Sequence, residues 1–178
     1  MDRYKLKFTR LQNEIFRLLC IKAGRSLNQR GIARPLQVSP TAVAKSLPEL
    51  NDLIKIEKSE TMNLASIELN RDKPKAIAFK RVENLKQIYE SGLAELLEEE
   101  FPGCTIILFG SYSLGEDIIS SDIDIAVIGL KEKDINLTKF DKLMERTIIL
   151  HFYHNLKINK NLKQNIINGI TLHGIVEL

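Results

Sequence analysis

The sequence has little cysteine and no long apolar run. Its two cysteines, Cys20 and Cys104, are far apart and lack the spacing of a metal site, so we expect both to be buried, reduced thiols. No stretch of about 18 apolar residues occurs, as a membrane-spanning helix would need. The first ten residues also lack the apolar segment of a signal peptide. These absences predict a cytoplasmic protein without a membrane span.

Acidic residues are scarce in the first third of the chain. Residues 1–60 contain twelve Lys and Arg against six Asp and Glu, whereas residues 61–178 contain fourteen against seventeen. The net charge of the 178-residue chain is only +3, so the basic excess is local. This asymmetry favours a polyanion as the partner of the N-terminal segment and a separate role for the remainder. On charge alone, a solvated basic face without a partner is an equal alternative.

Two helices are expected within residues 9–36. Residues 9–23 place apolar side chains at i, i+4, i+7 and i+8, which is one face of an amphipathic helix, and Gly24 ends it. Ser26, three residues before Gln29, has the spacing of a capping box. We therefore expect a second short helix that begins there and runs to about Leu36.

A third helix is expected to begin at Ser39 and Pro40, an N-cap followed by proline in the first helical position. Its apolar stripe consists of Val43, Leu47 and Leu50. The opposite face is expected to carry small or basic residues that suit a phosphate-lined major groove. We predict that duplex DNA is bound by the following residues of the second and third helices: Arg30, Arg34, Ser39, Thr41, Ala42, Lys45 and Ser46.

A β-hairpin is expected after the three helices, with strands at 53–59 and 64–70 and a polar turn between them. The phrase VSPTAVAKSLPELNDLIKIEK within this region resembles winged-helix transcription regulators. The resemblance covers residues 9–70 and implies that the third helix enters the major groove while the hairpin touches the DNA backbone. Winged helices also serve as protein docking modules, and that alternative stays open.

The chain then becomes helical in pattern from Pro74 to Phe101, with a break expected at Ser91 and Gly92. We therefore predict a winged-helix DNA-binding domain over residues 1–72, a connecting helix over 73–91 and a second domain over 92–178.

Two aspartates interrupt an otherwise apolar strand in this second domain. Asp122 and Asp124 share one face of the strand expected over 121–127, because strand side chains alternate. Two carboxylates at that spacing suit Mg²⁺ or Mn²⁺, which takes its other ligands from water or phosphate. Upstream, Gly110 lets the backbone pass close to a phosphate and Ser111 offers a hydroxyl. The two segments together predict a site for a metal ion and a triphosphate.

The motif G-S-x3-G-x5-S-D-x-D resembles the nucleotidyltransferase superfamily that includes DNA polymerase beta. It is formed here by Gly110, Ser111, Gly115, Ser121, Asp122 and Asp124. With little expected after the third strand, the region resembles the minimal nucleotidyltransferases, including the antitoxins of HEPN/MNT pairs, over residues 92 to about 157.

The resemblance implies an α+β protein: an N-terminal winged helix-turn-helix followed by a polymerase beta-like palm domain with a small mixed sheet. It also implies that Asp122 and Asp124 are catalytic residues and metal ligands. The nucleotide-binding residues it implies are Gly110, Ser111, Gly115 and Ser121. The implied reaction transfers a nucleoside monophosphate from a nucleoside triphosphate to an acceptor hydroxyl, with Mg²⁺ or Mn²⁺ as the cofactor.

The family's third acid is missing, because its pattern places Ile149 at that position in the strand over 147–153. His151 lies on the same face, but imidazole is a poor ligand for Mg²⁺. We expect His151 and His154 to be ordinary surface or core histidines. Three functions remain open: a nucleotidyltransferase, a DNA-binding regulator with a degenerate nucleotide-binding domain, and an antitoxin with a HEPN-type protein partner. A homodimer is expected.

Overall fold

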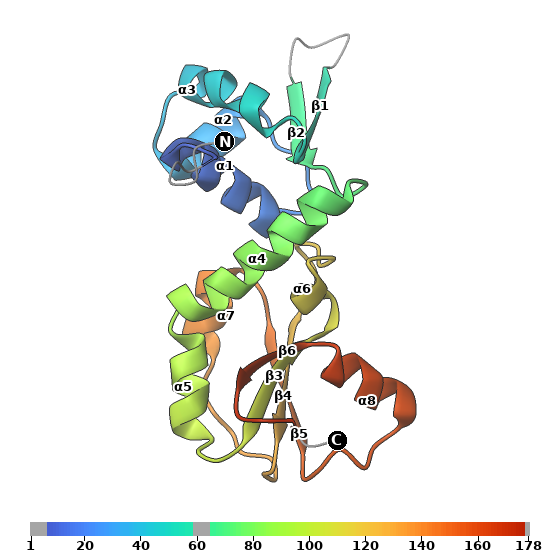
Figure 1. Cartoon of the computed structure of the whole chain (residues 1–178). Coiled ribbons are helices and arrows are strands. Elements are labelled where there is room, and N and C mark those ends of the chain that lie inside the picture. The colour runs from blue at the N-terminus through green and yellow to red at the C-terminus, as the bar shows by residue number, and fades with distance from the viewer. Residues whose placement is uncertain (1–6, 59–64, 177–178) are drawn as a thin grey trace. The chain divides into compact units, whose positions relative to one another are not determined.

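The computed structural model describes residues 7–58 and 65–176. The chain forms two compact units, Met1–Lys80 and Arg81–Leu178 (Figure 1). The division falls inside helix α4, Pro74–Glu90, which ends just before Gly92, where φ is +77°. The break expected at Ser91 and Gly92 is therefore confirmed. None of the helices in the described ranges is long and apolar enough to cross a membrane.

The N-terminal unit is a winged helix-turn-helix. Three helices, a 3₁₀ turn and an antiparallel hairpin follow one another: α1 Arg10–Ile21, α2 Gln29–Leu36, α3 Pro40–Ser46, η1 Leu47–Leu50, β1 Ile54–Lys58 and β2 Ala65–Leu69. The α-helix α3 gives way to the 3₁₀ turn η1, which contains Pro48, because proline cannot donate the hydrogen bond that an α-helix requires. The expected order is confirmed, while the polar turn of the hairpin lies outside the described residues.

Helix α2 begins later than its capping-box spacing indicated. The N-cap is Asn28, whose side chain accepts a hydrogen bond from the Gly31 N–H at 2.8 Å. Ser26 cannot serve as the cap, because the next residue, Leu27, is held in extended form by paired backbone hydrogen bonds to Ile67. The expectation of a helix start at Ser26 is therefore wrong.

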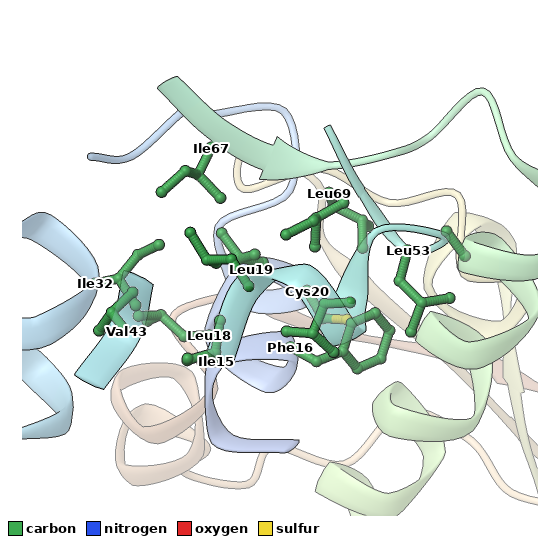
Figure 2. Close-up of a cluster of buried hydrophobic side chains, with 14 of the residues drawn as sticks. Ile15, Phe16, Leu18, Leu19, Cys20, Ile32, Val43, Leu53, Ile67 and Leu69 are labelled. Atoms are coloured by element: carbon green, nitrogen blue, oxygen red, sulfur yellow. The ribbon is translucent and has the colours of Figure 1, made fainter. Parts of the chain in front are cut away.

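The core of the N-terminal unit is built mainly from apolar side chains. Figure 2 shows side chains of α1, α2, α3 and the hairpin packed together. Ile15, Ile32, Val43 and Ile67 each have no exposed surface, and Cys20 is almost completely buried. Because the helices are short, this burial rather than helix propensity supplies most of their stability. Cys20 and Cys104 are both buried and form no disulfide with each other, as expected.

A mixed four-stranded sheet organises the C-terminal unit (Figure 1). Its strand order is β5-β4-β3-β6, formed by β3 Thr105–Phe109, β4 Ile123–Ile128, β5 Ile148–Tyr153 and β6 Ile170–His173. The β4–β5 pair is parallel, and the other two pairs are antiparallel. One face packs against α5, Leu93–Glu100, and α7, Thr138–Met144, while the other packs against α8, Lys160–Ile167.

The chain continues structurally beyond the third strand. Helix α8 follows β5, and β6 then joins the sheet beside β3. At Gly169, just before β6, a Cβ would lie 2.4 Å from the Leu108 carbonyl oxygen, so glycine is required for the chain to pass against β3. The expectation of little structure after the third strand is wrong, because a four-residue strand gives too weak a pattern to detect.

Candidate functional site

The glycine turn and the carboxylate strand lie directly against each other. Gly110 follows β3 with φ at +71° and begins the short helix α6, Gly110–Leu114. A Cβ at Gly110 would lie 2.7 Å from Asp124 Oδ2, so the carboxylate would have to move, and the positive φ independently favours glycine. Gly115 then ends α6 in a left-handed conformation. The predicted phosphate and metal segments are therefore brought together.

Asp124 and Asp122 differ in their surroundings. Asp124 belongs to β4 and its side chain is 30% exposed, whereas Asp122 is exposed and precedes the strand. The expectation that β4 begins at 121 is therefore wrong by two residues, and its first ladder residue is Ile123. Ser121 accepts a hydrogen bond from the Ile118 N–H at 3.0 Å, so its hydroxyl holds the turn that leads into Asp122.

Ile149 lies beside Asp124 across the parallel β4–β5 ladder. Register partners in such a ladder point to the same face of the sheet, so the isoleucine side chain, 36% exposed, lies next to the carboxylate. The structure thus places an apolar residue where the resemblance implies a third acid.

His151 contacts the carboxylate strand. Its Nε2 lies 2.9 Å from Asp124 Oδ1, and its ring packs edge-on against Phe109 with centroids 5.3 Å apart. His151 is therefore a partly exposed histidine in contact with a predicted metal ligand, and the expectation that it is an ordinary histidine stays a prediction. His154 follows β5 and is exposed.

Tyr153 completes this part of the sheet. Partial burial raises the pKa of the Tyr153 phenol, and the negative charge of Asp124 adds to the increase.

A buried polar network lies behind the site. Asn84 Nδ2 of α4 donates to Asp117 Oδ1 at 2.7 Å and to the Tyr112 carbonyl oxygen at 2.9 Å. Arg146 Nη2 lies 3.3 Å from Asp117 Oδ2, and both charged side chains are at most 1% exposed. Asn84 and Asp117 were not predicted from the sequence, because neither has a periodic signal.

The predicted DNA-contacting residues of the N-terminal unit are exposed with two exceptions. Ala42 is half-buried, and Ser46 is 9% exposed, with its hydroxyl donating to the Ala42 carbonyl oxygen at 3.0 Å. Ser46 follows Val43 by three residues and precedes Leu50 by four, which puts it beside the apolar stripe. The expectation that Ser46 lies on the outward face is therefore wrong. The exposed residues are Arg30, Arg34, Ser39, Thr41 and Lys45.

Residues 90–173 match the family model of the nucleotidyltransferase domain. This part of the chain is a nucleotidyltransferase domain. The match includes α8 and β6, so the domain extends beyond the limit of about residue 157 that the motif alone indicated.

Solved structures resemble the chain only weakly. The adhesin competence repressor AdcR of Streptococcus pyogenes is 20% identical, with 57% of this chain and 72% of that chain covered and a TM-score of 0.42. The zinc-responsive MarR family member ZitR of Lactococcus lactis is 23% identical, with 58% and 69% covered and a TM-score of 0.41. The S. aureus MepR–DNA complex gives 23% identity, 52% and 78% coverage and a TM-score of 0.37. A search of curated proteins returned no match.

A cleft of about 360 Å³ opens beside Asp122 in the nucleotidyltransferase domain. It lies between the turn that precedes β4 and the connection from α7 to β5. Its lining is Ile119, Ser120, Ser121, Asp122, Asp141, Lys142, Glu145, Arg146 and Thr147. The exposed carboxylate of Asp122 therefore borders this cleft, just before strand β4, which lies against the glycine turn.

The donor set of the nucleotidyltransferase domain fits one hard cation. Among the described residues, no group of three or more His, Cys, Asp or Glu side chains is arranged to hold a metal ion. Mg²⁺, however, is commonly held by one or two carboxylates together with substrate phosphates. Asp124 is a carboxylate beside the close backbone approach at Gly110, and Asp122 is a second one two residues earlier, whereas Ile149 has no oxygen to offer a second ion.

Proposed function

We propose that this chain is a DNA-binding regulator whose nucleotidyltransferase domain binds a nucleoside triphosphate with Mg²⁺ or Mn²⁺ and transfers its nucleoside monophosphate slowly or not at all. The observation that carries the proposal is the pairing of Asp124 with Ile149 beside an otherwise intact glycine turn.

Binding of the triphosphate is supported by the contact between Gly110 and Asp124. The missing Cβ lets the Gly110 backbone and the Asp124 carboxylate lie close together, so that a phosphate held by the turn could share a cation with Asp124. Asp122 and Asp124 would hold the metal, which supplies charge neutralisation to the triphosphate when bound. Asp124 repels a lone triphosphate, so nucleotide and metal should bind together.

Weak transfer follows from the residue beside Asp124. In the implied reaction an acceptor hydroxyl attacks the α-phosphorus, its O–H proton leaves and pyrophosphate is released. Ile149 cannot accept that proton, and it cannot complete a second metal site. The chain therefore keeps groups for ligand binding while lacking a carboxylate for the chemical step.

DNA binding is supported by the N-terminal unit. Its third helix follows a tight turn and exposes Thr41 and Lys45, and α2 exposes Arg30 and Arg34. The basic excess of residues 1–60 lies in the same unit. Phosphate contacts by such residues provide affinity for duplex DNA that depends on salt.

Thermal shift measurements test the nucleotide site. Mg²⁺ with a saturating triphosphate should raise the melting temperature, because ligand at 100 times its dissociation constant stabilises by about 2.7 kcal/mol. Asp124→Asn should cancel most of the shift, and Asp134→Asn, which alters an exposed acid of the same unit, should leave it unchanged. No shift of the unmodified protein with any triphosphate and divalent metal would refute binding.

Label transfer tests the chemistry. The unmodified protein should transfer little or no label from α-labelled triphosphates to itself or to co-purifying molecules, and Ile149→Asp should increase transfer. Ile149→Val is the matched control, since it keeps the strand position apolar. Rapid transfer by the unmodified protein would show that another residue replaces the third acid.

A further inference from the structure

The two halves of the nucleotide site are joined by a segment that α4 holds in place. Residues 112–121 connect the glycine turn to Asp122, and they include all but the first two residues of the five-residue helix α6. A helix of this length has no stability of its own, so its position depends on tertiary contacts. The contacts that fix residues 112–121 therefore also fix the site.

Asn84 supplies two of those contacts. Its carboxamide donates to the Tyr112 carbonyl oxygen inside α6, at 2.9 Å, and to the Asp117 carboxylate after α6, at 2.7 Å. Asn84 and Asp117 are 2% and 1% exposed, so water competes little for these hydrogen bonds. The other oxygen of Asp117 faces Arg146, which precedes β5 and its residue Ile149. One carboxylate thus joins α4 to the entrance of β5.

Helix α4 is continuous from Pro74 to Glu90, so Asn84 stands on an element that begins in the N-terminal unit. A packed helix moves as a rigid element, and a change in the position of α6 would act on it directly through the two hydrogen bonds. The two hydrogen-bond partners described here, Tyr112 and Asp117, are not among the residues assigned to the metal or the phosphates.

We propose that Asn84 is a positioning residue through which occupancy of the nucleotide site is coupled to DNA binding by the N-terminal unit. The coupling rests on the proposed function, since it requires both ligands. Nucleotide binding shifts α6 and Asp117, and Asn84 conveys the shift to α4. Linkage requires that each ligand changes the affinity of the other by the same factor.

The test measures DNA affinity with and without Mg²⁺ and a triphosphate, and triphosphate affinity with and without DNA, on the full chain. We expect a mutual change of about fivefold or more, within the usual range for coupled sites. Asn84→Ala should reduce the factor to about one in both directions while both ligands still bind. A merely structural role would not remove the coupling alone.

Gln87→Ala is the matched control, because Gln87 is a buried carboxamide on the same helix, 5% exposed, outside this network. It should keep the coupling. If Asn84→Ala does not fold, Asn84→Gln, which displaces the carboxamide by one methylene, replaces it with the same expected loss. The inference would be overturned if both ligands bind without changing each other's affinity, or if the coupling survives the substitution of Asn84. The proposed function would stand in either case. Failure of the unmodified protein to bind either ligand would overturn both.

Discussion

The two units place polar side chains differently. The core cluster of the N-terminal unit consists of apolar side chains, with a few polar ones such as Lys80 also buried in that unit, and the candidate DNA-binding residues Arg30, Arg34 and Lys45 are exposed on helices that this core holds. Beneath the candidate site of the C-terminal unit lies the buried network of Asn84, Asp117 and Arg146. A basic surface needs only a rigid scaffold, whereas a phosphate site needs backbone in one position, and buried hydrogen bonds provide that.

The largest effect is expected from breaking the buried ion pair of the C-terminal unit, Arg146–Asp117. The exposed pair of the N-terminal unit, Lys75–Asp52, is compared with it. Asp117→Ala leaves the buried Arg146 guanidinium without this carboxylate, and breaking such a pair costs about 3–5 kcal/mol. Hydrogen exchange should show loss of protection in β3 and β4 with α1 unchanged, because the cost falls on the C-terminal unit.

Asp52→Ala is the control in the N-terminal unit. The Lys75 ammonium lowers the pKa of the Asp52 carboxyl, but both groups are exposed to water. Solvent screening makes such pairs weak, so no change in protection is expected in either unit. Equal effects of the two substitutions would contradict the comparison.

A smaller effect is expected at the basic surface. Lys45→Ala removes one phosphate contact, so the slope of log affinity against log salt should become shallower by about 0.9. Affinity should fall similarly for all DNA sequences, without loss of stability, because Lys45 is exposed. The readout is DNA binding at several salt concentrations.

Two controls sharpen this prediction. Lys157→Ala changes an exposed lysine of the C-terminal unit and should leave the slope unaltered. Ser46→Ala should also leave it unaltered, since the Ser46 hydroxyl is used inside α3. A slope that does not respond to Lys45→Ala, or binding that does not depend on salt, would favour protein docking by the winged helix.

The order of helices and strands in the N-terminal unit was predictable, because the patterns that indicate it involve residues close together in the sequence. Ser39 and Pro40 mark the start of α3, and Val43, Leu47 and Leu50 mark the buried face of α3 and η1, as the structure confirms. The start of α2 was missed because Leu27 pairs with Ile67, forty residues away. A capping box at Ser26 is a local preference, and this tertiary contact overrides it.

The candidate site was predictable where composition is unusual. Glycine and paired aspartates in apolar strands pointed to Gly110 and Asp124, which the structure brings together. The buried role of Asp117 has no comparable signal, because an aspartate in a polar loop usually faces solvent. The contact of His151 with Asp124 depends on the parallel register of β4 and β5, which only the fold determines.

The smallest expected effect concerns the pKa of Tyr153. Burial is the larger cause of its increase and the charge of Asp124 the smaller, so Asp124→Asn should lower this pKa while leaving it above the ordinary value of about 10. The pKa of Tyr153 is higher in the folded than in the unfolded protein, so the stability it contributes is lost as the pH rises from about 10 through the folded-state pKa. Asp124→Asn should narrow this pH range. Alkaline absorbance titration of each protein against its Tyr153→Phe counterpart isolates this phenol. An unchanged pKa in Asp124→Asn would mean that solvent screens the carboxylate, and a site so well solvated would hold its cation weakly.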